Sequence, residues 1–356
     1  MAPAVPRHAT TSQKRWCPSL VSRLGHIRIH SYLGASGSVT SNTYNTAYAR
    51  PSPWPIAKHK LALPRAFQGV AGPPVQLSRS CKSWLPPFEK STTLERLEDG
   101  LWLLQQDFIG ADAAMNARLN CFVIQLPDHS LMVISPVSQT EQARALHALL
   151  PGPVTHILCP SVSPEHWLHA PDLVKQWPHC TVWACPGIAE TSALLGSVPG
   201  QRDVWADMQA NTSSSSGGTL DVRVITNGSC PPELAGDVQF ATFASQPAVL
   251  QEVTTFIKSR RAVVLADMAF MQPLDLLERL PAPVRAVSRK LQVAGRLGCP
   301  IPFPAMTKNP ELGLAWRNEV LGWQAWERLL CCHLQPLVGD GREQFARCFS
   351  FLGPLV

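Results

Sequence analysis

The chain has 356 residues and a net charge of +6, but the charge is distributed unevenly along it. Residues 1–88 contain eleven of the 31 lysines and arginines and none of the 25 aspartates and glutamates, so residues 89–356 have a net charge of −5. This acidic balance gives no reason to expect nucleic-acid binding by residues 89–356. No run of about 18 or more apolar residues without charge occurs, and we expect no membrane span.

Residues 1–88 have the composition of an organelle transit peptide. The segment is basic, rich in Ser, Thr, Ala and Pro, and without the continuous apolar stretch of a secretory signal. We expect it to be disordered and to be recognised by organelle import machinery. A disordered basic arm that binds nucleic acid or an acidic surface is the alternative. Composition does not separate chloroplast from mitochondrial import.

Residues 89–356 are enough for one large domain with a substantial core. Three short strand-like runs lie within residues 94–137, and helical spacing follows in TEQARALHALL. Next come VTHILCP as a strand, residues 165–177 as a helix, CTVWACP as a strand and GIAETSALLG as a helix. This alternation predicts a parallel sheet layer covered by helices. The stretch NTSSSSGG at 211–218 is expected to be a surface loop.

Beyond that loop the pattern changes to strands in direct succession. Four strand-like runs lie between residues 220 and 268, and helices return through residues 275–325, interrupted by the proline-rich CPIPFPAM. WERLLCCHL is predicted as a late strand and DGREQFARCFSFL as a closing helix. Two β-rich halves that each carry helices predict an α/β fold, an αββα sandwich of two packed mixed sheets with helices outside.

The eleven cysteines are scattered without any CxxC pair, and several lie inside apolar runs. This distribution favours buried free thiols in a reducing compartment over a disulfide framework. Cys331 and Cys332 are neighbours on a predicted strand, so their side chains point to opposite faces and cannot both join one metal site. Glu252 lies in the apolar strand LQEVTTF, where it could take part in a site or face solvent, and of the two we expect solvent.

Several short motifs follow one another in a distinctive order. LWLL stands near the start, ISPV before the first helix, a loop ending in EH after the next strand, VVLAD after paired strands, and CCHLQP before the last helix. Over about residues 94–352 this order resembles the metallo-β-lactamase superfamily. More narrowly, the chain is similar to an uncharacterised plant, algal and cyanobacterial family labelled as a domain of unknown function. The resemblance implies the sandwich fold and favours the chloroplast, because those relatives are photosynthetic.

The resemblance also implies where metal ligands would stand. Active members have a His-x-His-x-Asp-His loop, a later His before a Pro, a bridging Asp at a strand end and a final His, and together these hold two metal ions that activate water. In this chain the histidine positions of the first metal are occupied by Ser161, Ser163 and Ser245. A serine hydroxyl is a poor zinc ligand. The usual two-metal site is therefore expected to be absent.

The positions of the second metal keep their ligand character, with Glu165, His166, Asp267 and His333. Two imidazoles and two carboxylates could bind one zinc, iron or manganese ion, although Glu165 is one methylene longer than the usual Asp. A shared ion requires the four side chains to lie within about 5 Å of one point. Glu165 is also the candidate catalytic residue, as a ligand or a general base.

These residues also have ordinary structural explanations. Residues 163–165, Ser-Pro-Glu, make a good helix start with serine as N-cap, proline at the first position and glutamate near the positive end of the helix dipole. His166 and His333 could be buried histidines satisfied by neighbours, and Asp267 could cap the segment that follows its strand.

Three functions are left open by the sequence. The first is a divergent or inactive hydrolase relative that acts in an organelle and binds a small molecule or a protein in the former active-site cleft. The second is a mononuclear metal-dependent hydrolase of an ester, thioester or lactone. The third is an iron-dependent oxidoreductase in the same pocket. The loss of the first metal's ligands favours the first of these.

Overall fold

The computed structural model describes residues 92–109, 116–197, 202–212, 220–226, 230–244, 250–299 and 310–353. The predicted transit segment, residues 1–88, lies outside the described residues, as do Ser245 and most of the serine-rich stretch 211–218. The expected disorder and import of the N-terminal segment, and the alignment of Ser245 with a metal ligand, therefore stay predictions.

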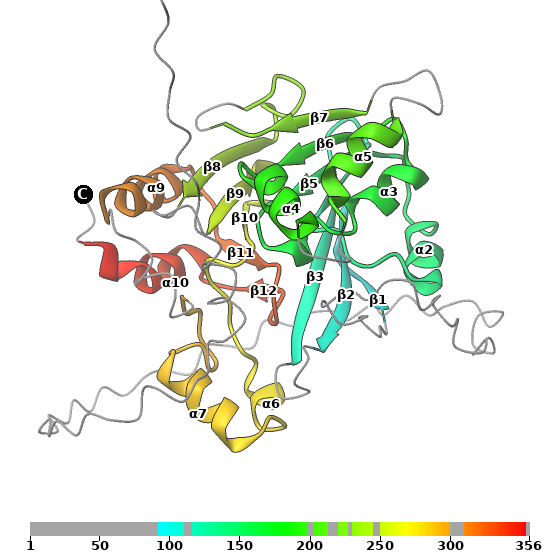
Figure 1. The fold of residues 1–356 in the computed structure, drawn as a ribbon. Helices are drawn as coiled ribbons and strands as arrows, with labels where there is room; N and C mark the ends of the chain where they lie inside the picture. The colour runs from blue at the N-terminus through cyan, green and yellow to red at the C-terminus, as the bar shows by residue number, and fades with distance from the viewer. Residues whose placement is uncertain are drawn as a thin grey trace, which may run out of the picture. The chain divides into compact units, whose positions relative to one another are not determined.

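The first sheet contains seven strands in sequence order (Figure 1). Its first four strands pair antiparallel and the pairs from β4 to β7 are parallel, so the sheet is mixed. The parallel half is the part that the alternation of strands and helices predicts. The strands are β1 (Thr92–Glu98), β2 (Leu101–Ile109), β3 (Asn116–Gln125), β4 (Leu131–Ile134), β5 (Val154–Cys159), β6 (Thr181–Ala184) and β7 (Asp221–Val224).

The second sheet has five strands in the order β12-β11-β10-β9-β8. Only the pair of β10 and β11 is parallel, and the other pairs are antiparallel. The parallel pair matters for the site, because the carboxyl ends of parallel neighbours meet at one edge of the sheet. The strands are β8 (Val238–Ala244), β9 (Gln251–Ile257), β10 (Ala262–Leu265), β11 (Arg328–Cys331) and β12 (Leu337–Val338).

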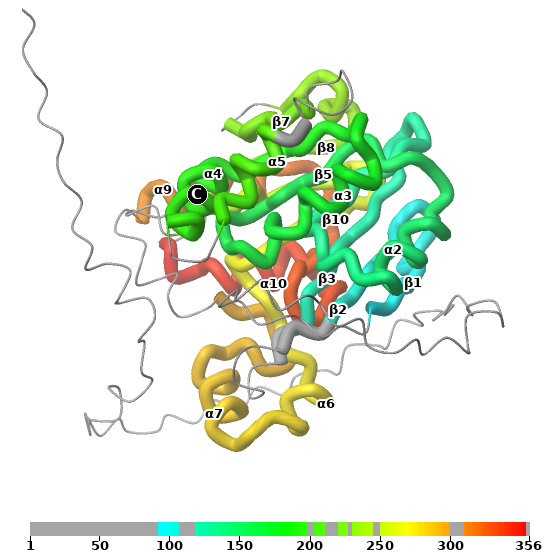
Figure 2. The backbone as a smooth tube through the Cα atoms, turned by 45° about the vertical axis from the view of Figure 1, so that its right-hand side comes forward, coloured from blue at the N-terminus to red at the C-terminus, as the bar shows by residue number. Residues whose placement is uncertain are grey.

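Helices cover the outer faces of both sheets, which confirms the predicted α/β fold. Four helices contribute buried side chains to the core of the first sheet, and two pack on the second. Figures 1 and 2 both show α6 and α7 apart from the sheets. The helices are α2 (Glu141–His147), α3 (Ala170–Gln176), α4 (Ile188–Gly196) and α5 (Val204–Thr212) on the first sheet, α9 (Pro310–Gly322) and α10 (Gly341–Cys348) on the second, and α6 (Leu274–Leu277) and α7 (Ala282–Lys290).

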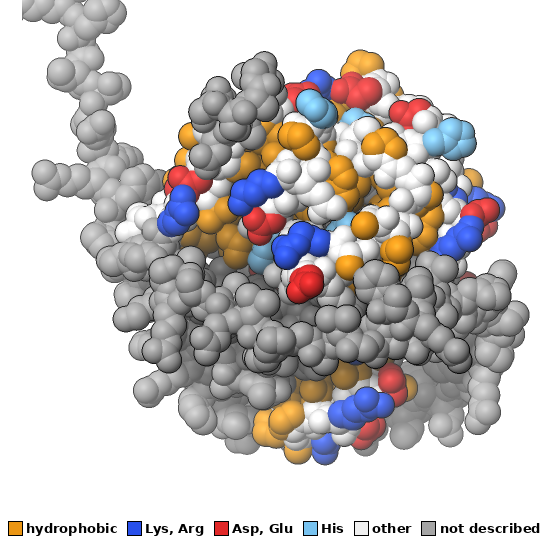
Figure 3. All heavy atoms as spheres, turned by 90° about the vertical axis from the view of Figure 1, so that its right-hand side faces the viewer, with side chains coloured by type: hydrophobic (Ala, Val, Ile, Leu, Met, Phe, Trp, Pro, Cys, Tyr) orange, Lys and Arg blue, Asp and Glu red, His pale blue; other side chains and the backbone are white. Residues whose placement is uncertain are grey.

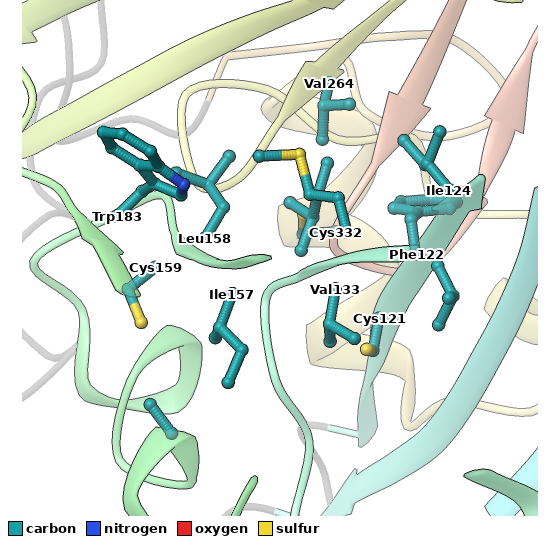
Figure 4. Packing of buried hydrophobic residues seen from close by; sticks show 14 of the residues in the cluster. Cys121, Phe122, Ile124, Val133, Ile157, Leu158, Cys159, Trp183, Val264 and Cys332 are labelled. Atoms are coloured by element: carbon teal, nitrogen blue, oxygen red, sulfur yellow. The ribbon is translucent and has the colours of Figure 1, made fainter. Parts of the chain in front are cut away.

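The core between the sheets is built by the alternation of side chains along each strand. Figure 4 shows Phe122 and Leu158 of the first sheet in one packed cluster with Val264 of the second sheet and Cys332, which follows β11, and all four are fully buried. Cys331 packs instead in the cluster on the outer face of the second sheet. The predicted opposite orientation of the two neighbouring cysteines is thus present.

The predicted helix over residues 165–177 is wrong in its first part. Pro164–His166 form a single 3₁₀ turn, and α3 begins only at Ala170. Pro171 explains the break, because its ring would clash with the carbonyl of residue 167 in a continuous helix and it has no N–H to donate. Ser163 does stand at the N-cap position before Pro164, but its side chain makes no capping hydrogen bond.

Helix α5 was not predicted from the sequence. Trp205 and Met208 lie three residues apart on it, and both are buried in the core of the first sheet. Their spacing is the signal that could have identified the helix. The serine-rich stretch at 211–218 was predicted to be a loop, and no helix was predicted directly before it.

Among the described helices, none has the length and apolar character needed to cross a bilayer.

On the face shown in Figure 3, lysine and arginine side chains lie close to aspartate and glutamate side chains rather than in one large basic patch. Over the described surface, oppositely charged side chains form ion pairs such as Lys175 with Asp172 and Arg223 with Asp221.

Candidate metal centre

The four predicted ligands come from three separate strand ends, and the structure brings them together. Glu165 and His166 belong to the 3₁₀ turn that follows β5 of the first sheet. Asp267 and His333 each stand two residues after a strand of the parallel pair β10 and β11. Leu265 and Cys331 are register partners at the ends of these strands, so the two following segments start side by side.

One donor atom from each of the four residues lies within 4.8 Å of the others. Three of the donors are closer still. His166 Nε2 is 3.1 Å from His333 Nε2 and 3.1 Å from Asp267 Oδ1, and His333 Nε2 is 3.0 Å from Asp267 Oδ1. The three atoms thus form a nearly equilateral triangle, with the partly exposed Glu165 at its side.

This triangle fits a bound transition-metal ion. Donors about 2.0–2.1 Å from a tetrahedral ion are separated from one another by roughly 3.3 Å, close to the observed distances. Two neutral imidazole nitrogens that face each other with lone pairs would repel, so the arrangement needs either a proton or a cation between them. Two histidines and one carboxylate are a common ligand set for zinc and for non-haem iron.

His166 is oriented by a second hydrogen-bonding partner. Its ring is fully buried, and Nδ1 lies 2.7 Å from the hydroxyl of Ser135. A metal-ligating histidine usually has such a partner on its other ring nitrogen, because the partner fixes the tautomer and the ring orientation. Ser135 directly follows β4 and has a positive φ of 59°, a backbone conformation that residues other than glycine seldom adopt.

The electrostatics of the cluster couple His166 to Asp267. Burial of the ring lowers the pKa of His166, but the charge and the hydrogen bond of Asp267, together with the charges of Glu165 and Glu252, outweigh burial and raise that pKa to about 9. For Asp267, burial acts to raise the pKa, and the two histidines overcome it and hold the pKa well below its ordinary value. A proton on His166 thus occupies the metal-free cluster at neutral pH.

The second carboxylate oxygen of Asp267 has its own partner. Ser161 donates a hydrogen bond from Oγ to Asp267 Oδ2 at 2.5 Å, and the same hydroxyl accepts one from the backbone N–H of Ser163 at 3.1 Å. Ser161 is therefore part of the site as a hydrogen-bonding residue. Ser163 contributes its backbone, and no hydrogen bond of its side chain to the cluster is found among the described residues.

His333 is held by strand β3 of the opposite sheet. Leu119 and His333 form an isolated bridge, and the backbone N–H of Asn120 donates to Cys332 O at 2.8 Å. The buried Asn120 side chain donates to Cys331 O at 2.7 Å and to Leu334 O at 3.3 Å. Asn120 was not singled out from the sequence, since a lone asparagine in an apolar strand gives no sign of its partners.

The expectation that Glu252 faces solvent is wrong. Glu252 is completely buried, and its carboxylate accepts hydrogen bonds from the backbone N–H groups of Ala266, Asp267 and Met268. Burial is the main cause that raises the pKa of Glu252 to about 7, the charge of Asp267 adds to it, and the three N–H groups act against it. Its position between apolar neighbours was the only sign in the sequence.

Comparison with known proteins identifies one family and a group of solved structures. Residues 98–190 match the family described as "Domain of unknown function (DUF4336)", which covers β2 to the start of α4. No curated protein sequence matches the chain.

The solved structures similar to this chain include a metal-soaked Flv1 flavodiiron core from Synechocystis sp. PCC6803, with 10% identity, a TM-score of 0.48, and coverage of 74% of this chain and 61% of that one. The chain therefore spans less than two thirds of that core. A metallo-β-lactamase from Pontibacter korlensis has 10% identity, a TM-score of 0.45 and coverages of 74% and 99%. One from Erythrobacter litoralis has 10% identity, a TM-score of 0.46 and coverages of 73% and 96%. These are similarities of fold, and they assign no function to the chain.

Proposed function

We propose that this protein is a mononuclear metal-dependent hydrolase with His166, Asp267 and His333 as the metal ligands. The observation that supports this most directly is the triangle of donors with sides of 3.0–3.1 Å, drawn from three strand ends. A bound divalent ion with an open coordination position would lower the pKa of a water molecule and polarise an ester, thioester or lactone carbonyl.

Glu165 is the candidate general base in this proposal. It belongs to the same turn as His166, its carboxylate lies within 4.8 Å of the other donors, and it is partly exposed, as Asp267 is, whereas His166 and His333 are buried. A carboxylate at the open side of a site can accept a proton from a nucleophilic water and deliver it to a leaving group. Ser135 and Ser161 orient His166 and Asp267, respectively.

A second candidate function has support from the donor set itself. Two histidines and one carboxylate also suit ferrous iron, and iron in this cluster would favour redox chemistry with oxygen. The two candidates differ in the metal that restores activity and in the need for oxygen. A protein that binds neither metal would instead be the inactive relative that uses the pocket for binding a small molecule.

The test is the metal content of the full-length protein after loosely bound metal has been removed by a weak chelator. About one equivalent of zinc or iron is expected in the parent, with loss of the metal in His166→Ala and His333→Ala. His156→Ala is a matched control, because His156 lies in β5 and its Nδ1 accepts a hydrogen bond from Trp183. Absence of stoichiometric metal in the parent would overturn both candidates.

Activity assays then distinguish hydrolysis from iron-dependent redox chemistry. Zinc-loaded and iron-loaded protein would be assayed on panels of esters, thioesters and lactones, with and without oxygen. Glu165→Gln is expected to keep the metal and to lower hydrolysis by about 100-fold or more, as removal of a general base does. A Glu165→Gln variant that retains full hydrolysis would exclude Glu165 as the base.

We also propose import into the chloroplast, with the mitochondrion as the alternative, from the basic, acid-free composition of residues 1–88. Mass spectrometry of the protein isolated from its native cells tests this. An intact segment from Met1 to Lys90 in the organelle would contradict import with cleavage.

A further inference from the structure

Glu252 lies next to the proposed metal centre, at a contact between the two sheets. It lies in β9 of the second sheet and forms an isolated bridge with Ser161, which follows β5 of the first sheet. Two backbone hydrogen bonds make this junction, from Val162 N to Gln251 O at 3.1 Å and from Val253 N to Pro160 O at 2.7 Å. The backbone of β9 thus holds the chain that leads into the turn with His166.

The Glu252 side chain holds the other half of the centre. Oε1 accepts from Ala266 N at 2.8 Å, and Oε2 accepts from Asp267 N at 2.6 Å and from Met268 N at 2.8 Å. Three consecutive N–H groups that converge on one carboxylate form an anion-binding backbone nest. These bonds fix the backbone of Asp267 two residues after β10 ends, where Asp267 has no strand partner among the described residues.

The contacts close into a ring. Glu252 binds the backbone of Asp267, the Asp267 carboxylate accepts the hydrogen bond from Ser161, and Ser161 is the bridge partner of Glu252. Asp267 is itself a proposed ligand, Ser161 lies in the segment that leads to His166, and Glu252 joins the two from β9. A displacement of Glu252 would therefore alter the distance between Asp267 and His166.

We propose that Glu252 is a positioning residue that sets the separation between Asp267 and the turn carrying His166. This role rests on the proposed function in one respect, namely that the group being positioned is a metal ligand. Glu252 holds the Asp267 loop through its carboxylate, while its chain neighbours Gln251 and Val253 hold the segment leading to His166 through their backbone. A glutamine cannot replace it, because an amide NH₂ group would face N–H donors instead of accepting from them.

The first test compares Glu252→Gln with Thr254→Val in the full-length protein. Thr254 lies two residues along the same strand, is fully buried, and accepts a hydrogen bond from Trp316 Nε1 at 3.1 Å. Glu252→Gln is expected to weaken zinc binding, measured by chelator competition, by about 10- to 100-fold and to shift the visible absorption bands of bound cobalt. Thr254→Val is expected to lower thermal stability without changing either metal readout.

Should Glu252→Gln fail to fold, Glu252→Asp provides the same comparison, because the charge remains but the shorter side chain cannot reach all three amides. Zinc affinity and cobalt bands equal to those of the parent in a folded Glu252 variant would overturn the proposal.

A second measurement needs no metal and keeps the two proposals distinguishable. Hydrogen exchange of the amides of residues 266–268 in metal-free protein is expected to accelerate at least about tenfold in the Glu252 variant, as loss of a buried acceptor frees these amides to open locally. Amides within β9 and β10 are expected to keep their protection. If the parent binds no metal, the proposed function fails. Even then, faster exchange of the amides of residues 266–268 in the Glu252 variant would support the positioning of Asp267 by Glu252. Unchanged exchange of these amides would contradict it.

Discussion

The Nε2 atoms of His166 and His333 lie 3.1 Å apart, although the residues are separated by 167 positions in the sequence. The rings meet edge to face, with centroids 4.9 Å apart. Both nitrogens also lie within hydrogen-bonding distance of one oxygen of Asp267. Such close nitrogens need a proton or a cation between them, and this requirement leads to the first prediction.

Zinc affinity should depend on pH, because a metal ion must displace the proton from His166. The pKa of His166 is raised to about 9, so the ring is protonated in the metal-free protein below that value. Each unit of pH below 9 should weaken apparent zinc binding about tenfold through this proton. Chelator competition at pH 6, 7 and 8 measures the effect. Binding that does not change between pH 6 and pH 8 would contradict a protonated His166.

Ser135 is predicted to support metal binding through its hydroxyl. Ser135→Ala and Ser135→Gly both remove the partner of His166 Nδ1, and both should weaken zinc binding about 10- to 100-fold. They should differ in stability, because φ is 59° at this position and glycine adopts a positive φ without strain. The glycine variant should be more stable than the alanine variant by about 1 kcal/mol in urea unfolding. Unequal zinc affinities would mean that backbone strain, not the hydroxyl, controls the site.

Asn120 should affect both stability and the metal centre. Asn120→Ala leaves the carbonyls of Cys331 and Leu334 without their side-chain donor and removes the acceptor of Gln105 Nε2, which lies 2.7 Å away. Loss of buried hydrogen bonds of this kind should lower the free energy of unfolding by about 2–3 kcal/mol. Zinc binding should weaken as well, since His333 follows Cys331 by two residues. Gln105→Ala is the control, because it removes the bond to Asn120 and leaves both carbonyls paired.

His147 is predicted to make the protein less stable in mild acid. Burial lowers the pKa of His147 from 6.5 to about 4, and its Nδ1 has no hydrogen-bond partner among the described residues. Between pH 6.5 and about pH 4, His147 is therefore protonated in the unfolded chain and neutral in the folded protein. Stability is complete above pH 6.5 and falls as the pH decreases toward 4. Between pH 7 and pH 5 the loss should be about 2 kcal/mol.

Urea unfolding at the two pH values measures this loss, and His147→Leu is the control variant. The leucine fills a similar volume beside Trp177, whose ring centroid lies 5.2 Å from that of His147. The variant should lose about 2 kcal/mol less than the parent over the same interval. An equal loss in both proteins would assign the acid sensitivity to other groups.

The sequence predicted most strands because their signal is local. The apolar runs before Cys159 and Asp267 became β5 and β10, and the opposite burial of Cys331 and Cys332 follows from the period of two along a strand. The break before α3 was also readable in principle, since Pro171 cannot lie inside a continuous helix. The prediction instead followed the helix-start pattern at residues 163–165 and placed Pro171 inside the helix.

The sequence itself determined the fold class, because periodic burial is a property of short segments, and the candidate site residues came from an order of short motifs that resembles the metallo-β-lactamase superfamily. Only the tertiary structure decided that Glu165, His166, Asp267 and His333 share one point, that Ser161 binds Asp267, and that Glu252 is buried among backbone N–H groups. The physical reason is that hydrogen bonds and metal coordination depend on distances of a few ångströms between residues that are 15 to 167 positions apart in the sequence, which no local pattern specifies.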